Sequence, residues 1–555
     1  MVAFAATAQA IAQAAGKNDK IALMAAYLRA LPESDLAAAT RFFTGNPFPQ
    51  AEQRALAVGG RTIVAAAKAA WGIDDASLRA GYRATGDLGA ALGPFVRPPV
   101  DLGLFREALT PARLKALLDA MAEAAGKSAG RKRQLLCERA LGACTDPIEA
   151  TFVIKIMTGD LRIGLREGLV VDAIAAAFER DPLAVRRAAT AAGDLGAVAL
   201  AAKADMLADV RLAYHVPLTF MLASPIAYGS AYQELGAGTW LVEDKYDGIR
   251  IQAHVTLDRI SLFSRTHNDV AATFPEIVAA LRPLGVPCIL DGEIVAQRDG
   301  RVLPFRYLQA RLARKVVASD LLDAVPVRFI VFDILARADE PLLDRALADR
   351  RGQLAEVCSA AREPLALAPW SALQSRSPEF VQARFELARA AGNEGLIFKR
   401  TDAPYAAGRR GKWWLKLKRE LSTLDVVVVA VEWGHGKRAR VLSDYTFAVR
   451  DGEHGLLTIG KAYSGLTDAE IAELTPWFLE HQTGQRGYAL AVEPQIVIEI
   501  AFDVIQPSNL HDAGFALRFP RIVRLRPDKR PADIDTLDRV AEIYGDMLAR
   551  EGVAR

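Results

Sequence analysis

Two patterns of apolar residues divide this chain of 555 residues. From residue 1 to about 205, apolar residues recur three and four positions apart, as at Leu114, Leu117, Leu118 and Met121, and Gly, Asp, Asn and Pro separate the segments. Because that spacing places apolar side chains on one face of a helix, it predicts a succession of helices. From about residue 212 short alternating runs such as 249–255 follow, and alternation is typical of strands.

The strand-like part changes again near residue 420. Before it, strand-like runs mix with helical segments at 274–281 and 378–391, which predicts an α+β domain. After it, a β-branched run at 426–431, further strand-like runs and one helical segment at 468–479 predict a small β-barrel of oligonucleotide-binding (OB) type. We therefore expect three domains: an all-α domain at 1–208, an α+β domain at 209–421 and an OB-fold domain at 422–555.

Composition excludes several classes of protein. Hydrophobic residues make up 51% of the chain and charged residues 24%, which is ordinary for a globular protein and argues against disorder. No apolar stretch reaches the roughly 18 residues that a membrane-spanning helix needs, so we expect no membrane partner. The four cysteines, Cys137, Cys144, Cys288 and Cys358, lack metal-ligand spacing and indicate core thiols of a cytoplasmic protein.

Positive charge is concentrated in two places, although the net charge is only +3. Residues 399–419 carry eight basic side chains against Asp402, and residues 518–530 carry six against Asp528. Trp413 and Trp414 lie within the first cluster, and basic residues beside aromatic ones suit a polyphosphate ligand. A solvated surface face is the alternative, and charge alone does not decide between them.

One short phrase recurs in the helical part. Residues 85–90 read Thr-Gly-Asp-Leu-Gly-Ala, residues 192–197 nearly repeat it, and residues 159–162 read Gly-Asp-Leu-Arg. Such a turn can begin a helix with exposed backbone N–H groups that receive a phosphate, which makes Gly86, Gly159, Arg162 and Gly193 candidate DNA contacts. Local chemistry by itself favours the alternative, that these are only helix-capping turns.

Residues 245–250, Lys-Tyr-Asp-Gly-Ile-Arg, place a lysine before a tight turn. A lysine is nucleophilic only when neutral, and burial or nearby cations favour the neutral amine. Arg250, Lys416 and Lys418 could supply those cations, and attack of the Lys245 amine on a phosphate would form a phosphoramidate. If Lys245 stood alone, an exposed lysine beside a hairpin turn would be the better interpretation.

Acidic and basic residues downstream suggest what Lys245 would act on. Glu293 and Glu394 each adjoin a glycine, and a pair of carboxylates near phosphates is typical of a Mg²⁺ site, although turn acids on the surface are equally common. Lys416 and Lys418 alternate along an expected strand, so they share one face and could both donate to one triphosphate.

Two further residues are candidates for binding a nucleotide. Arg265 could clamp a phosphate or a ribose. Phe332, which is expected to end an apolar strand just ahead of Asp333, could stack on a base, although such a residue alone is more often part of a core.

Together these segments resemble, in order, the nucleotidyltransferase motifs of ATP-dependent DNA ligases. The residues that carry the resemblance are 243–250, 291–293, 332–335, 394–399, 414–418 and 517–526. The helical first third, with Gly-Asp-Leu-Arg-Ile-Gly at 159–164, resembles the DNA-binding domain of archaeal, eukaryotic replicative and some bacterial ligases. The resemblance covers nearly the whole chain.

The resemblance implies a role for each motif residue. Lys245 would become adenylated, Glu243 would receive the adenine amino group, and Phe332 would stack on the base. Arg250 and Arg265 would contact ribose and phosphates, and Glu293 and Glu394 would contact ribose and metal. Lys416 and Lys418 would hold the α-phosphate. Arg518 and Arg524, within the basic segment 518–529, would contact ATP. Residues 461–467 depart from the family pattern, which leaves DNA contacts there open.

The resemblance therefore implies an ATP-dependent DNA ligase that seals nicks in duplex DNA during replication, repair or recombination. ATP and Mg²⁺ (or Mn²⁺) would be required, and a hinge at 420–425 would let the barrel move. We expect a monomer that works in the cytoplasm at the nucleoid; the motifs do not indicate a pathway or a sliding-clamp partner.

Three alternatives use the same residues differently. An RNA ligase and a capping-type guanylyltransferase share the lysine chemistry, but the helical region argues against both, and Glu243 suits adenine better than guanine. A DNA-binding scaffold with an inactive pocket would have no physical need for this set of charged residues.

Overall fold

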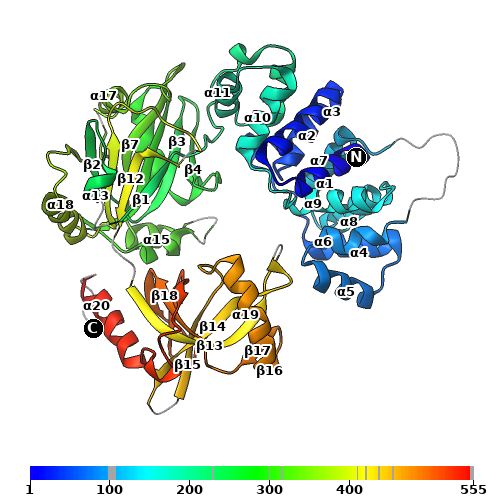
Figure 1. Ribbon diagram of the computed structural model, residues 1–555. Coiled ribbons are helices and arrows are strands. Elements are labelled where there is room, and N and C mark those ends of the chain that lie inside the picture. Colours follow the sequence, from blue (N-terminus) through cyan, green and yellow to red (C-terminus); the bar gives the residue numbers. More distant parts are fainter. Residues whose placement is uncertain are drawn as a thin grey trace. The chain divides into compact units, whose positions relative to one another are not determined.

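The computed structural model describes residues 1–97, 108–227, 231–298, 300–312, 314, 317–359, 361–408, 410–418, 422–435, 438–452 and 455–550 (Figure 1). The chain forms two compact units. One comprises residues 1–59, 103–136 and 156–419, and the other comprises residues 60–102, 137–155 and 420–555. The domain boundaries expected from the sequence stay predictions.

The first two hundred residues are helical, as the apolar spacing predicts. In the described part of the chain, the first strand begins only at Leu222. The helices are α1 (Val2–Gln13), α2 (Lys17–Ala30), α3 (Glu33–Phe43), α4 (Gly60–Trp71), α5 (Asp75–Thr85), α6 (Leu88–Leu92), α7 (Pro111–Glu123), α8 (Ala129–Gly142), α9 (Pro147–Thr158), α10 (Glu167–Phe178), α11 (Pro182–Ala192) and α12 (Leu195–Lys203). None of the described helices is both long and apolar enough to cross a membrane.

Residues 222–418 contain two β-sheets with helices around them. The five-stranded sheet has the order β1 (Leu222–Ile226), β12 (Arg410–Lys418), β11 (Gly395–Arg400), β2 (Trp240–Lys245) and β10 (Trp370–Ala372). The second sheet has the order β4 (Ile260–Ser264), β3 (Ile249–Val255), β5 (Cys288–Arg298), β7 (Val327–Arg337) and β8 (Glu340–Pro341), with β6 (Arg301–Val302) beside β5 and β9 (Leu365–Leu367) beside β7.

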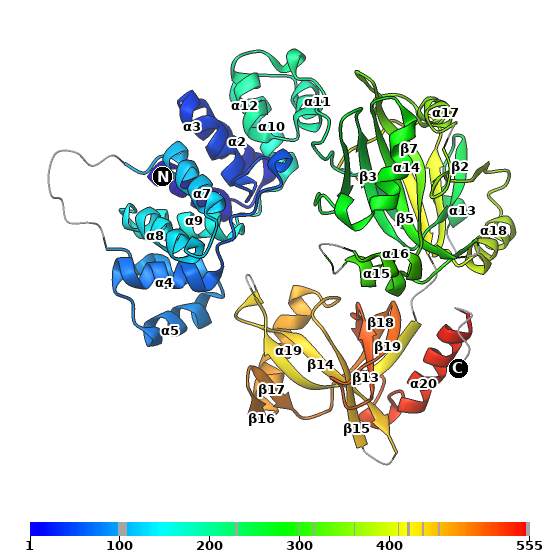
Figure 2. The same cartoon turned by 180° about the vertical axis from the view of Figure 1, so that it is seen from behind.

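Helices and apolar side chains cover both sheets. The helices are α13 (Ala231–Glu234), α14 (Pro275–Leu281), α15 (Phe305–Leu312), α16 (Ser319–Ala324), α17 (Leu347–Val357) and α18 (Pro378–Ala390). Figure 2 shows α14 lying across β3 and β5, where Ile277 and Leu281 join the sheet's core. Another apolar cluster includes Leu335 of β7 and Trp414 of β12, so side chains of the two sheets pack against each other.

The turn after Lys245 connects the two sheets. The sequence is compatible with a hairpin, but β2 and β3 belong to different sheets and do not pair. Gly248 lies in this crossing, where a Cβ atom would stand 2.2 Å from the Ile294 carbonyl oxygen, so only glycine fits without displacing β5. Lys245 is therefore the last residue of a strand in one sheet, just before the chain crosses to the other sheet.

The C-terminal part is rich in strands, and its expected runs are confirmed as strands. One sheet contains β13 (Ser422–Trp433), β14 (Leu442–Asp451), β15 (Gly455–Ala462), β16 (Gln482–Arg486), β17 (Ala489–Val492), β18 (Val497–Phe502) and β21 (Arg521–Leu525). β19 (Val504–Pro507) pairs with β20 (Phe515–Arg518), and α19 (Asp468–Glu480) and α20 (Leu537–Arg550) pack on the common core. The expected hinge starts at residue 420, which lies outside the described residues, and Asp425 is already within β13.

Candidate active site

Lys245 forms an ion pair at the end of β2. Its Nζ atom lies 2.7 Å from Oε2 of Glu394, and Lys418 contacts the same oxygen. The sheet register explains this arrangement, because Gly395 of β11 pairs with Lys245 on one side and with Lys418 on the other. Burial raises the pKa of Glu394, but the two ammonium groups outweigh burial and hold that pKa below its usual range. Two cations thus share one carboxylate.

Two further carboxyl groups crowd this ion pair. Burial, opposed by Lys245 and Arg250, raises the pKa of Glu293 to about 7, and the Glu394 carboxylate adds to the rise. Burial and the same carboxylate also raise the pKa of Asp247. Carboxyl groups that resist ionisation together indicate a place where a further cation would be stabilised.

The acids fit a magnesium ion that phosphate helps to hold. Carboxylate oxygens are ligands that Mg²⁺ prefers. Within the described ranges, however, no group of three or more Asp, Glu, His or Cys side chains is arranged to hold a metal alone. Mg²⁺ commonly takes one or two carboxylates and completes its shell with waters and phosphate oxygens, and Glu293 with Glu394 meets that requirement.

Arg250 is held by Asp291 beneath the site. Its Nε and Nη2 atoms donate to the two oxygens of Asp291 at 3.0 and 2.7 Å, and Nη1 donates to the Met221 carbonyl oxygen at 2.7 Å. Tyr405 donates its hydroxyl hydrogen to the same carboxylate at 2.8 Å. The sequence prediction gave Arg250 a role toward ribose and phosphate, and missed the two groups that fix its orientation.

A second charged cluster surrounds Glu243, whose carboxylate contacts two cations. Its side chain is buried, with Oε1 2.9 Å from Arg351 Nη1 and Oε2 2.5 Å from Lys399 Nζ. The Lys399 ammonium also lies 4.0 Å from the centre of the Phe332 ring. The predicted base-binding residues Glu243 and Phe332 are therefore brought together.

Sequence reasoning missed Lys399 and Arg351 as parts of this cluster. Lys399 ends the motif that begins at Glu394, and its place in that motif is a signal that could have pointed to it. Arg351 has no such signal, because it lies in α17 more than a hundred residues from Glu243. Burial, opposed by Glu243, lowers the pKa of Lys399.

The other predicted nucleotide contacts come from β7, from β12 and from the residue after β4. Phe332 stands within β7 rather than at its end, and its ring meets Trp414 edge-on at 6.0 Å. Lys416 lies two residues before Lys418 on β12, so the two share a face as predicted. Arg265 directly follows β4 and is exposed.

Arg518 and Arg524 belong to the other compact unit. Arg518 ends β20, and its guanidinium lies 5.0 Å from the ring centre of Phe519. Arg524 lies in β21 and pairs with Glu499 at 2.7 Å. Their expected contacts with ATP stay predictions.

The repeated Gly-Asp-Leu-Gly phrases form the same local structure twice. Gly86 and Gly193 end α5 and α11 with φ angles of 59° and 60°, and the aspartates that follow cap α6 and α12. In the first copy Asp87 pairs with Lys155 of α9, and in the second Asp194 pairs with Arg41 of α3. The capping interpretation therefore describes both turns, and a carboxylate rather than an open set of N–H groups stands at each helix start.

The third relative of the phrase is built differently. Gly159 has a φ angle of 73° and Arg162 one of 53°, and Arg162 pairs with Asp160 at 2.7 Å. This segment starts no helix at the aspartate, since α10 begins only at Glu167. As with Gly86 and Gly193, contact with DNA stays a prediction.

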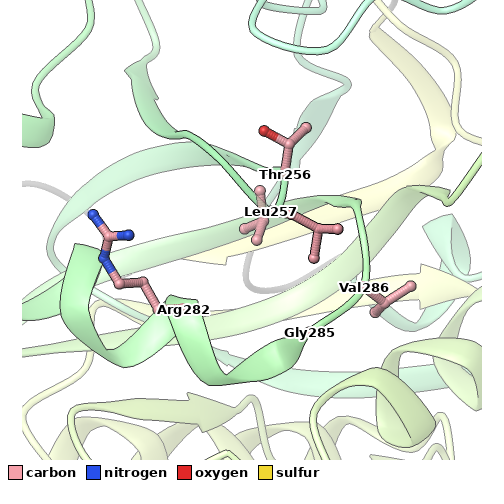
Figure 3. A pocket seen from close by; sticks show the side chains of 6 residues that line it. Thr256, Leu257, Arg282, Gly285 and Val286 are labelled. Atoms are coloured by element: carbon pink, nitrogen blue, oxygen red, sulfur yellow. The ribbon is translucent and has the colours of Figure 1, made fainter.

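One small pocket lies away from all of these residues. Val255, Thr256, Leu257, Arg282, Gly285 and Val286 line it (Figure 3). Val255 ends β3 five residues after Arg250, and at ~3.3 Å per residue the pocket lies about 17 Å along the strand from the site. Nothing in its lining matches the predicted chemistry.

Comparison with known proteins supplies the remaining evidence. Three family models match: DNA ligase N terminus at residues 1–175, ATP dependent DNA ligase domain at 220–418, and ATP dependent DNA ligase C terminal region at 438–529. A probable DNA ligase of Koribacter versatilis is 43% identical, covering 98% of this chain and 96% of that protein, and a DNA ligase of Thermococcus fumicolans is 34% identical, covering 95% of each. A solved structure titled Pmar-Lig_PreS3 covers 94% of this chain and 99% of that one at a TM-score of 0.58 and 16% identity, a likeness of fold.

Proposed function

The chain belongs to the family of ATP-dependent DNA ligases, with its three-domain architecture, and from that premise we propose that Lys245 is the residue that carries AMP. The observation that supports this role is the ion pair with Glu394, whose oxygen Lys418 shares. It holds the amine where two sheets meet, beside acids suited to a cation. A phosphate that enters would meet Lys418 as well as the nucleophile.

The proposed reaction has three steps. In the first, Lys245 loses its ammonium proton to solvent, because an ammonium group has no lone pair, and its ion pair with Glu394 ends. The neutral amine then attacks the α-phosphorus of ATP, a P–N bond forms, pyrophosphate leaves, and the amine releases a second proton. In the second, a 5′-phosphate oxygen at the nick attacks the AMP phosphorus and the P–N bond breaks. In the third, the 3′-hydroxyl attacks the 5′-phosphate and AMP leaves.

The surrounding residues have proposed roles toward the nucleotide. Glu243 accepts a hydrogen bond from the adenine amino group, and Phe332 stacks on the base. Lys416 and Lys418 hold the α-phosphate on one face of β12. Arg250, oriented by Asp291, and Arg265 reach the ribose and phosphates.

A divalent ion fits the same site in this proposal. Glu293 and Glu394 would hold Mg²⁺ or Mn²⁺, which would stabilise negative charge on the phosphates. Glu394 then has two alternative partners, the lysine pair and the metal, and binding of the metal would release Lys245 from its ion pair.

The DNA ligase family binds DNA, and we extend this to nicked duplex DNA bound by a monomer. The helical region would contact phosphates rather than base edges, so binding would be largely independent of sequence and would weaken with salt. The C-terminal part is proposed to be an OB-fold that brings Arg518 and Arg524 to ATP. Because Asp87 and Asp194 cap their helices, basic side chains are better candidates for phosphate contacts than the turns at Gly86 and Gly193.

The proposal is tested by incubating the protein with α-labelled ATP and Mg²⁺. Wild type should become labelled and pyrophosphate should appear, and labelled protein should pass its AMP to nicked DNA. Label that never attaches to wild type, or that attaches equally to Lys245→Ala, would refute the mechanism. GTP in place of ATP, and nicked RNA in place of nicked DNA, separate ligation of DNA from capping and from RNA ligation.

A further inference from the structure

Arg351 contacts both residues that are proposed to recognise the base. Its Nη1 atom donates to Oε1 of Glu243 at 2.9 Å and to the carbonyl oxygen of Phe332, also at 2.9 Å. Its Nη2 atom donates to the carbonyl oxygen of Ala368 at 2.8 Å. The side chain is only 9% exposed, so water does not compete strongly for these bonds.

These contacts join the two sheets through one side chain. Glu243 lies in β2 of the five-stranded sheet, and Phe332 lies in β7 of the other. Arg351 itself comes from α17, which packs against β7. A planar guanidinium fixes the directions of its donors, so the three acceptors hold each other in place through it.

The contacts also determine what Glu243 can accept. Arg351 and Lys399 are both cations, and each forms an ion pair with one oxygen of the Glu243 carboxylate. An ionised carboxylate only accepts hydrogen bonds and has about four lone-pair positions, so lone pairs remain on each oxygen for a donor. It would attract the amino group on carbon 6 of adenine and repel the carbonyl oxygen at that position in guanine.

We propose that Arg351 is a positioning residue that sets the preference for adenine by holding the Glu243 carboxylate and the Phe332 backbone at a fixed separation. This inference rests on the proposed role of Glu243 in reading the base. Without Arg351, Glu243 would keep its bond to Lys399 but lose its tie to the other sheet. The Glu243 carboxylate, which reads the base, and the Phe332 ring, which stacks on it, would then no longer be fixed relative to each other.

The neighbouring residue Asp244 provides a matched control. It follows Glu243 on β2 and therefore points to the opposite face of the sheet. Arg384 of α18 donates to its Oδ1 atom at 2.6 Å, so this pair also ties a helix to β2 through an arginine and a carboxylate. Arg384→Met removes such a bond without touching Glu243 or Phe332.

The experiment compares two substrates on each protein preparation: ATP and purine riboside triphosphate, which lacks the 6-amino group. The rate constant for forming the covalent nucleotide on Lys245 is measured in single turnovers at subsaturating nucleotide. In Arg351→Met the preference for ATP should fall by about tenfold, equivalent to about 1.4 kcal/mol. Arg351→Lys should recover part of the preference, and Arg384→Met should retain all of it.

The ratio of the two rates separates positioning from a general effect on folding. A variant that is partly unfolded loses both rates equally, so an unchanged ratio in Arg351→Met would overturn the inference. Glu243→Met, which has no oxygen to accept the bond, is measured alongside. If Glu243→Met loses the preference while Arg351→Met keeps it, only the role of Arg351 fails. If Glu243→Met keeps the preference, the proposed role of Glu243 fails and this inference with it.

Discussion

Gly395 allows the two lysines to share Glu394, and replacing it should disable adenylation. Gly395 has a φ angle of 157° and lies between Lys245 and Lys418 in the sheet register. A Cβ atom there would stand 2.1 Å from the Leu417 carbonyl oxygen and 2.8 Å from the Phe385 ring, whereas real Cβ contacts almost never fall below 3.0 Å. The neighbouring strand β12 would have to move by roughly 1 Å.

That displacement gives an expected magnitude. Moving a catalytic group by about 1 Å can cost on the order of a hundredfold in rate. Gly395→Ala should therefore slow the formation of lysyl-AMP by about two orders of magnitude, measured in single turnovers with labelled ATP at saturating concentration. The backbone shift would act on Lys418 and Glu394 directly, so a higher ATP concentration should not restore the rate.

Gly411, on the same strand β12, is the matched control. A Cβ atom at Gly411 would meet nothing within 4 Å. Gly411→Ala should stay within about threefold of wild type, which is less than 1 kcal/mol in activation free energy. The reasoning is refuted if Gly395→Ala adenylates at the wild-type rate, or if Gly411→Ala is slowed as much.

Three more predictions concern charged groups. Burial raises the pKa of Glu293 to about 7, and the protonated group is a poor metal ligand. The Mg²⁺ concentration needed for half-maximal lysyl-AMP formation should therefore rise as pH falls through 7. The same Mg²⁺ concentration on both sides of pH 7 would contradict this. Arg350→Met leaves the fully buried Asp333 without its bidentate partner and should lower the free energy of unfolding by about 3–5 kcal/mol, measured as a lower denaturant midpoint, with partial recovery when Asp333→Asn is added. Asp194→Ala removes the cap of α12 and the ion pair with Arg41, and should cost about 1–2 kcal/mol by the same measurement.

The sequence was informative where the structure repeats a short period. Alternation along 249–255 predicted β3 to the residue, and alternation of Lys416 and Lys418 predicted their common face. The helical region followed from spacing of three and four residues in the same way. Local periodicity is sufficient in these cases because the element and the pattern have the same length scale.

The site depends on contacts that no local pattern encodes. The partners of Glu243 illustrate this, because Arg351 and Lys399 follow it by more than a hundred residues and reach it only when α17 and β11 are in place. Asp291 and Tyr405, which orient Arg250, are likewise far apart in the chain. The motif resemblance identified residues that face the nucleotide, but Arg351 and Tyr405, which hold two of those residues in place, lie outside every motif.

Two adjacent arginines show how this support is organised. Arg350 of α17 binds the Asp333 carboxylate, and Arg351 binds the backbone oxygen of Phe332 together with Glu243. Asp333 is fully buried, whereas the Phe332 ring contacts Lys399 and Trp414 of the base site. The same turn of α17 thus fixes two successive residues of β7. It follows that a change at Arg350 should act chiefly on stability, and a change at Arg351 chiefly on the choice of nucleotide, although the two residues are neighbours.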